Sequence, residues 1–243
     1  MLEYMEQGKW AKPLGRWSIP LIALALAACG SEAPVAEQPE RAEAGSPTNA
    51  EVPVMGPERR ILAFGDSLFA GYNVAKEESY PAQLERALRA QGINARVSNA
   101  GVSGDTSAAG LQRFQFTLDA QEGVPDLLIL ELGGNDLLRG LSPSETRSNL
   151  EAMIKEAQSR GIKVLLMGMQ SPPNMGADFV EQFNGLYPAL AKQYGTAFIP
   201  FWVEAVAGKP ELIQDDRIHP TEEGIEVLVG DTMDGVVAAL PKE

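Results

Sequence analysis

Four short segments of this 243-residue chain carry the residue types that acyl transfer requires. They are residues 65–68 (GDSL), 99–106 (NAGVSGDT), 133–136 (GGND) and 215–220 (DDRIHP). They offer a serine hydroxyl as nucleophile, glycine-rich backbone and an amide as donors to an oxyanion, and a carboxylate beside an imidazole as base and base-orienting group. The chain has one histidine, His219, so any chemistry that uses an imidazole must use that residue.

Alternating strands and helices are expected to position these segments. Short apolar runs predict strands at 60–65, 93–99, 126–132, 162–169 and 196–200. Helical patterns are expected at 80–91, 107–120, 142–160, 178–194 and 221–240, the third opening with a capping box at 142–145 (SPSE). This alternation predicts an α/β fold with a parallel sheet and helices on both of its faces. Because sites in such sheets form outside the carboxyl ends of the strands, the four segments should meet at one edge.

The four motifs resemble those of the SGNH (GDSL-type) hydrolase family over residues 60–225, in the same order and at similar spacing. They are most similar to the arylesterase, acyl-CoA thioesterase I and lysophospholipase L1 group. The resemblance implies a single three-layer αβα domain with a five-stranded parallel sheet and a flavodoxin-like fold. It also implies a serine esterase without cofactor or metal. Its substrates would be carboxylic esters or thioesters of short to medium acyl chains, including lysophospholipids, hydrolysed through an acyl-enzyme intermediate.

The resemblance also implies a role for each matching residue. Ser67 is expected to be the nucleophile, His219 the general base and Asp216 the group that orients the histidine. The backbone N–H groups of Ser67 and Gly104 and the side-chain amide of Asn135 are expected to form the oxyanion hole. Elementary chemistry supports these roles, because a serine hydroxyl needs a base and histidine has a suitable pKa near neutrality. A turn across three residues can bring the Asp216 carboxylate to Nδ1, leaving Nε2 to face Ser67.

Alternatives remain for several of these roles. Asp215 is the alternative orienting carboxylate, and Gly101 is the alternative oxyanion donor. Asn135 is alternatively a helix cap. Asp66 and Asp136 are interpreted as acceptors that shape their loops rather than as catalytic groups.

The substrate pocket is the least constrained part of the prediction. Phe69 departs from the family pattern, which usually has a small Ser or Thr there, so it is expected to narrow the mouth or line the acyl site. The expected wall residues are Phe69, Leu137, Leu138, Pro172 and Met175. Two other functions compete with the esterase. One is a carbohydrate O-acetylesterase of the same family, and the other is a non-catalytic, membrane-tethered binding module on a retired hydrolase fold.

The N-terminal region is predicted to direct export. Residues 1–28 are typical of a lipoprotein signal peptide, with three basic residues followed by a 12-residue apolar run that is too short to span a membrane. Residues 26–29 (LAAC) resemble a lipobox, which implies lipidation of Cys29. Residues 29–57 then form a Pro-, Ala- and Glu-rich linker, and 58–243 form the hydrolase domain. The expected location is the periplasmic face of a membrane, and Gly30 after the cysteine favours the outer membrane of a Gram-negative cell.

Composition limits the partners. The net charge of −13 argues against binding to nucleic acid, which requires clusters of Lys and Arg. One cysteine cannot form an internal disulfide, and one cysteine with one histidine cannot build a structural zinc site. The expected partners are therefore a small ester or thioester substrate and a membrane reached through the lipid on Cys29.

Overall fold

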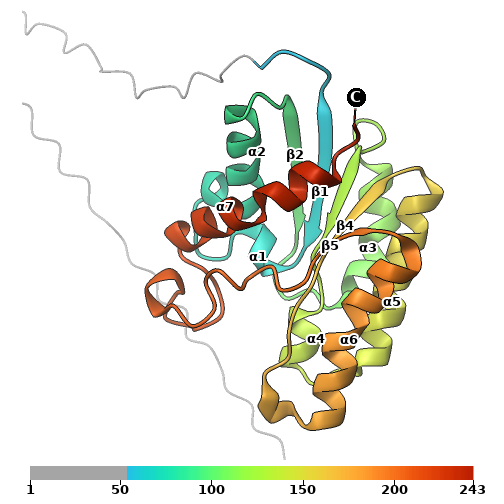
Figure 1. Cartoon of the computed structure of the whole chain (residues 1–243), viewed down its shortest axis with the longest axis vertical. Helices are drawn as coiled ribbons and strands as arrows, with labels where there is room; N and C mark the ends of the chain where they lie inside the picture. The colour runs from blue at the N-terminus through green and yellow to red at the C-terminus, as the bar shows by residue number, and fades with distance from the viewer. Residues whose placement is uncertain (1–53, 243) are drawn as a thin grey trace, which may run out of the picture. The chain divides into compact units, whose positions relative to one another are not determined.

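The computed structural model describes residues 54–242, which are built around a five-stranded sheet (Figure 1). The strands are Arg59–Gly65 (β1), Ala95–Gly101 (β2), Leu127–Leu130 (β3), Lys163–Met167 (β4) and Ala197–Ile199 (β5). All neighbours in the sheet pair in parallel, in the order β2-β1-β3-β4-β5. The predicted five-stranded parallel sheet is confirmed, and its strand order is that of flavodoxin-like folds.

Strand β1 illustrates why the central strands are continuous apolar runs. Ile61 and Ala63 belong to one buried cluster, whereas Leu62 and Phe64 belong to the cluster on the other face. Successive side chains of a strand point to opposite faces, so a strand covered on both sides needs apolar residues at every position.

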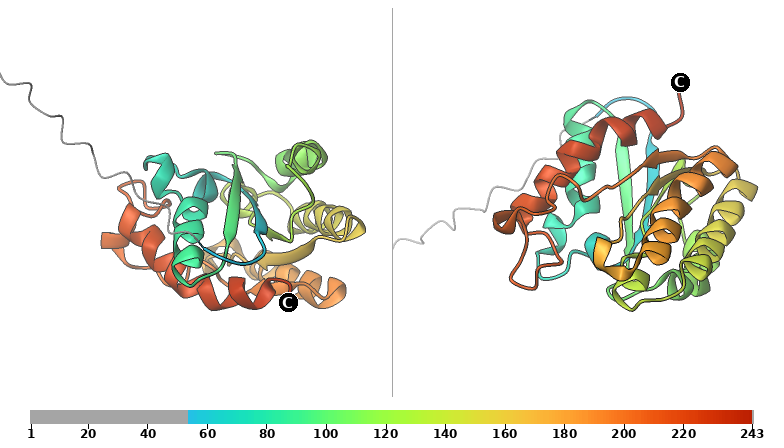
Figure 2. Two further views of the ribbon diagram at one scale, coloured as in Figure 1. Left: turned by 90° about the horizontal axis from the view of Figure 1, so that it is seen from above. Right: turned by 60° about the horizontal axis from the view of Figure 1, so that its bottom comes forward.

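Two layers of helices cover the sheet (Figure 2). One layer contains α2 (Tyr80–Ala90) and α7 (Glu222–Ala239), and the other contains α3 (Ser107–Asp119), α5 (Pro143–Ser159) and α6 (Ala177–Tyr194). The five predicted helices lie within one residue of these bounds at each end. The strand ends differ from prediction by up to two residues, because hydrogen bonding between strands, and not the apolar pattern, sets where each strand begins and ends.

The predicted capping box of α5 does not form, although the helix begins at Pro143 as expected. The hydroxyl of Ser142 bonds with that of Ser144 at 2.7 Å instead of accepting from the backbone of Glu145. The Glu145 N–H donates to the carbonyl of Ser142 at 3.0 Å. A neighbouring hydroxyl has therefore taken the place of the helix N–H as the partner of the cap side chain.

Two short helices that the sequence pattern did not reveal begin just beyond β1 and β3. They are α1 (Ser67–Ala70) and α4 (Gly134–Leu138), and each is too short to show a helical period. Short 3₁₀ helices also occur at Lys76–Glu78, Pro173–Met175 and Pro210–Leu212. α1 and α4 matter because they carry Ser67 and Asn135 at the carboxyl edge of the sheet.

The predicted signal peptide, Cys29 and most of the predicted linker lie outside the described residues. Within residues 54–242, no helix has both the length and the apolar character needed to cross a membrane.

Candidate active site

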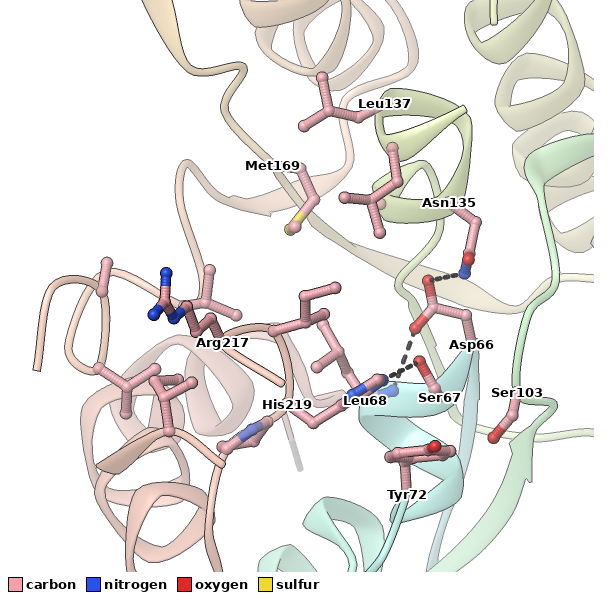
Figure 3. Close-up of a pocket in the computed structure, with 18 of the residues that line it drawn as sticks. Asp66, Ser67, Leu68, Tyr72, Ser103, Asn135, Leu137, Met169, Arg217 and His219 are labelled. Carbon is pink, nitrogen blue, oxygen red and sulfur yellow. Dashed lines mark hydrogen bonds between the residues drawn. The ribbon is translucent and has the colours of Figure 1, made fainter. Parts of the chain in front are cut away.

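Ser67, His219 and Asp216 form a continuous hydrogen-bonded relay. His219 Nε2 lies 2.8 Å from Ser67 Oγ, and His219 Nδ1 lies 2.6 Å from Asp216 Oδ2 (Figure 3 shows the first of these bonds). The structure thus brings together the three residues expected to form a triad, from loops 152 residues apart in the chain. Asp216, rather than its neighbour Asp215, contacts the ring.

The turn after β1 holds Ser67 in place. The carboxylate of Asp66 accepts the backbone N–H of Leu68 at 3.0 Å and so caps α1. Gly65 precedes Asp66, and a Cβ added at Gly65 would lie 2.6 Å from a carboxylate oxygen of Glu131. The absence of a side chain at Gly65 therefore lets β1 run directly into the helix that presents the serine.

The turn that carries His219 is fastened by Gln214. The Gln214 backbone N–H donates to the His219 carbonyl at 2.7 Å, and its side-chain amide donates to the carbonyls of Tyr72 and Pro220 at 2.9 and 2.8 Å. The N–H of Arg217 donates back to the Gln214 carbonyl at 2.9 Å. These bonds fix the histidine loop against the segment that follows α1.

Hydrogen bonds hold Asp216 in its charged form. Partial burial raises the pKa of its carboxyl, but the backbone N–H and ring of His219 and the N–H of Ile218 outweigh burial and lower the pKa to about 2. The two backbone N–H groups donate to Oδ1 at 2.9 and 3.0 Å, leaving Oδ2 for the imidazole. A charged Asp216 can thus fix the tautomer of His219 and stabilise an imidazolium.

Three potential oxyanion donors line the same cavity, namely Ser67, Gly104 and Asn135. Among residues 54–242 no acceptor is paired with the backbone N–H of Ser67 or of Gly104. Gly104 adopts φ +84°, in the left-handed region that favours glycine, and its carbonyl accepts from Arg139 at 2.8 Å. Asn135 donates from Nδ2 to Asp66 Oδ2 at 3.0 Å, which orients its amide (Figure 3).

Gly101 has a different environment from Gly104. Its N–H already donates to the side chain of Asn99 at 2.9 Å, and an added Cβ would lie 2.3 Å from the backbone nitrogen of Ala70. Gly101 therefore serves the packing of β2 against α1, and this geometry favours Gly104 over Gly101 as the oxyanion donor.

Two buried carboxyls lie beneath the nucleophile. Burial raises the pKa of Asp66 to about 6, although the hydrogen bonds from Leu68 and Asn135 favour the charged form and lower the pKa. Burial, reinforced by the nearby Asp66 carboxyl, raises the pKa of Glu131 well above its ordinary value. Glu131 Oε2 accepts the backbone N–H of Asp66 at 3.2 Å. Asp136 is also buried and accepts hydrogen bonds from Ser107 and Thr146, so Asp66 and Asp136 are both loop-shaping acceptors, as predicted.

An apolar cavity of about 490 Å³ opens at the relay. Its apolar side chains come from the segments that follow β1, β3, β4 and β5 and include Leu68, Leu137, Leu138, Met169, Val203, Val206, Ala207, Ile213 and Ile218. The predicted wall residues Leu137 and Leu138 do line it.

The expected positions of Phe69, Pro172 and Met175 need correction. Phe69 is fully buried and stacks on Tyr80 with ring centroids 5.1 Å apart, so it fills the core instead of narrowing the mouth. Pro172 and Met175 are not among the residues that line the cavity. The sequence placed them in a loop after β4, but residues 203–213, which follow β5, supply that wall instead.

Sequence reasoning missed several residues at the site. Tyr72 stacks on the His219 ring, with centroids 4.2 Å apart and planes 29° apart. Val203 and Val206 line the cavity from an irregular loop, where apolar residues outside any strand were the available signal. Arg217 also lines the cavity, and its place between Asp216 and His219 in the motif was the available signal. Within residues 54–242 there is no cluster of three or more His, Cys, Asp or Glu side chains able to hold a metal ion.

Comparison with known proteins defines the class. A profile of the GDSL-like Lipase/Acylhydrolase family matches residues 63–227. The chain is 42% identical over 160 residues to Esterase TesA of Pseudomonas aeruginosa, covering 66% of this chain and 79% of that protein. It is 41% identical to the Arylesterase of Vibrio mimicus over 68% of this chain and 81% of that one. The crystal structure of AlinE4, an SGNH-hydrolase family esterase, has 60% identity and a TM-score of 0.65, covering 77% of this chain and 100% of its own.

The chain therefore belongs to the GDSL-like lipase/acylhydrolase (SGNH hydrolase) family. It is a carboxylic ester hydrolase with the fold of that family.

Proposed function

We propose that this esterase cleaves carboxylic esters and thioesters of short to medium acyl chains through an acyl-enzyme intermediate on Ser67. The observation that carries the proposal is the relay of two hydrogen bonds from Ser67 Oγ through His219 to Asp216, at the edge of an apolar cavity. The names of relatives add support, since they include an arylesterase and a thioesterase 1/protease 1/lysophospholipase L1.

The geometry supports a two-step reaction. His219 Nε2 removes the proton of Ser67 as Oγ attacks the ester carbonyl, and the charged Asp216 stabilises the resulting imidazolium. The developing oxyanion accepts hydrogen bonds from Ser67 N–H, Gly104 N–H and the amide of Asn135. The imidazolium then gives its proton to the leaving alcohol or thiol. In the second step water replaces the alcohol and releases the acid and free serine.

The cavity favours an acyl chain over a sugar. Its volume of about 490 Å³ is in the range of small-molecule sites, and apolar side chains form most of its wall. An acetylated carbohydrate would present hydroxyl groups to these side chains and lose their hydrogen bonds to water. The non-catalytic module is disfavoured because the complete relay and its donors are retained.

Substitution of the nucleophile tests the proposal. Ser67→Ala should abolish hydrolysis of 4-nitrophenyl butyrate, with a fall in kcat of at least about 10³-fold, because it removes the attacking oxygen. The melting temperature should stay close to that of the wild type, since only one oxygen is removed. A panel of 4-nitrophenyl esters and acyl thioesters from two to twelve carbons would then define the preferred acyl length. Full activity in Ser67→Ala would overturn the assignment.

We also propose that the mature protein is anchored to a membrane, on its periplasmic face, by lipid on Cys29. The support is the sequence alone, in which an apolar run of signal-peptide length ends at the chain's one cysteine. Expression of the full chain in a bacterium fed an alkyne-tagged fatty acid should label the wild type but not Cys29→Ser. Equal labelling of the two proteins would contradict the proposal.

A further inference from the structure

Arg217 stands in a backbone conformation that arginine rarely adopts. Its φ is +62°, and among residues 54–242 Asn73 is the other non-glycine residue with positive φ. Asparagine tolerates this region, whereas a longer side chain crowds its own backbone there. Glycine would adopt the turn without that cost. Backbone strain of this kind is concentrated at functional sites, and Arg217 lies two residues before the catalytic histidine.

The guanidinium of Arg217 is available to bind a ligand. Within the described part of the chain it has neither a hydrogen-bond acceptor nor a carboxylate partner. Several other arginines are paired, such as Arg113 with Asp105 at 2.6 Å and Arg160 with Asp119. Because Arg217 is exposed, its guanidinium is free to meet a charged group of a ligand that enters the cavity.

Arg217 is exposed at the rim of the cavity. It lines the cavity together with Val203, Val206, Ile213 and Ile218. An ester that fills this part of the cavity would meet apolar side chains and one positive charge. Guanidinium groups match the oxygens of phosphate and carboxylate groups, often through two parallel hydrogen bonds.

The reaction geometry indicates which part of the substrate reaches Arg217. Figure 3 shows Arg217 and Asn135 on opposite sides of the cavity, with Ser67 and His219 between them. His219 protonates the leaving oxygen, so the leaving group must lie against the loop that carries His219. Arg217 belongs to that same loop, two residues earlier in the chain.

We propose that Arg217 binds an anionic group, a phosphate or a carboxylate, on the alcohol part of the ester and so makes this esterase selective for esters with negatively charged leaving groups. The inference rests on the proposed function, since it assumes attack by Ser67 and proton transfer from His219. A monoacylglycerol phosphate should accordingly be a better substrate than the uncharged monoacylglycerol with the same acyl chain.

Two matched substrate pairs test the proposal and distinguish the two anions. The first pair is 1-octanoylglycerol 3-phosphate and 1-octanoylglycerol. The second is 4-(octanoyloxy)benzoate and its methyl ester. For each pair the ratio of kcat/KM, anionic over neutral, is measured in the wild type, Arg217→Gly and Arg217→Lys. Asn73→Gly is the matched control, because it also relieves a positive φ but removes no charge.

The preferred anion should lose its advantage in Arg217→Gly, with the anionic-over-neutral ratio of kcat/KM falling about tenfold. Arg217→Lys should retain part of the ratio, and Asn73→Gly all of it. The wild-type ratio should also fall as salt rises, because an exposed pair is screened. The melting temperature of Arg217→Gly should equal or exceed that of the wild type.

Other results would overturn the inference. An unchanged ratio in Arg217→Gly, or an equal loss on anionic and neutral esters, would show that the guanidinium does not select the leaving group. If Arg217→Gly fails to fold, Arg217→Gln provides the same comparison without a change to glycine. Failure of the proposed function would give a different result, because hydrolysis of the neutral esters would then persist in Ser67→Ala. In that case binding of octyl phosphate to Ser67→Ala, with and without Arg217→Gly, still tests the anion site.

Discussion

Two aspartates near the nucleophile have pKa values shifted in opposite directions. Asp216 lies in a partly exposed turn, where hydrogen bonds to its charged form lower its pKa to about 2. Asp66 is buried beneath Ser67, and burial raises its pKa to about 6 although it also accepts two hydrogen bonds. The difference shows that the number of hydrogen bonds a carboxyl accepts does not by itself set its charge. The cost of removing the charged carboxylate from water can outweigh two good hydrogen bonds.

The two positions also serve the site differently. Asp216 contacts the base and stabilises charge that appears during the reaction. Asp66 contacts Leu68 and Asn135, so it shapes the turn that carries the nucleophile and orients an oxyanion donor. Removing the first should therefore affect catalysis most, and removing the second should affect the response of stability to pH.

The largest effect is expected for Asp216→Asn. The amide would present an N–H to His219 Nδ1 and favour the wrong tautomer, so kcat on 4-nitrophenyl butyrate should fall by about 10³–10⁴-fold. The control is Asp215→Asn, the adjacent exposed aspartate, which should stay within about twofold of the wild type. Comparable losses in both variants would remove the distinction between Asp216 and its neighbour.

A smaller loss is expected for Asn135→Ala, which removes a donor held in place by Asp66. Loss of one oxyanion donor typically costs about 10²–10³-fold in kcat, with little change in KM. Steady-state kinetics would measure both constants, and Ser103→Ala, another polar residue of the cavity wall, is the control. A rise in KM with kcat unchanged would assign Asn135 to ground-state binding instead.

The two aspartates should change stability in adjacent pH windows and with opposite sign. The pKa of Asp66 is higher in the folded protein than in the unfolded protein, so protonation of Asp66 favours folding. The stability that this protonation contributes is fully present below the unfolded pKa of 3.8 and is lost as pH rises through about 6. The loss should be up to about 3 kcal/mol, since each pKa unit corresponds to about 1.4 kcal/mol. The lowered pKa of Asp216 gives stability that is present above 3.8 and is lost as pH falls toward about 2.

Denaturant unfolding from pH 2 to 7 would check these signs. The wild type should lose stability relative to Asp66→Asn between about pH 4 and 6, and relative to Asp216→Asn between about pH 4 and 2. The same slope for both variants would refute the contrast between the two carboxyls.

The smallest effect is expected at Tyr72, which stacks on the imidazole. Tyr72→Leu should lower kcat about two- to twelvefold, because an aromatic contact of this kind contributes about 0.5–1.5 kcal/mol. Tyr72→Phe keeps the ring and should match the wild type. If Tyr72→Phe loses as much as Tyr72→Leu, the hydroxyl rather than the stack matters.

Much of this fold and site could be predicted from the sequence. The strands buried on both faces are continuous apolar runs, and the long helices have clear ends, so their order and the shared edge of the sheet followed directly. Ser67, Asp216 and His219 lie in short motifs whose residue types already define a chemistry. Their distances required the structure, because the serine and the histidine are 152 residues apart.

The pocket could not be predicted in the same way. Phe69 is adjacent to the serine motif, but α1 turns its ring into the core against Tyr80. Val203 and Val206 reach the cavity from an irregular loop, whose path depends on tertiary packing and not on a local pattern. The buried carboxyl pair of Asp66 and Glu131 was also hidden, since burial is a property of the assembled layers.

The most direct test of the central claim is to identify the residue that acts as the nucleophile. The protein is mixed with a fluorophosphonate, and the adduct is located by mass spectrometry of peptides, in the wild type and in His219→Ala. The account predicts one adduct, on Ser67, formed at least about 10²-fold more slowly without the imidazole. An adduct on another residue, or labelling of Ser67 at the same rate in His219→Ala, would contradict it.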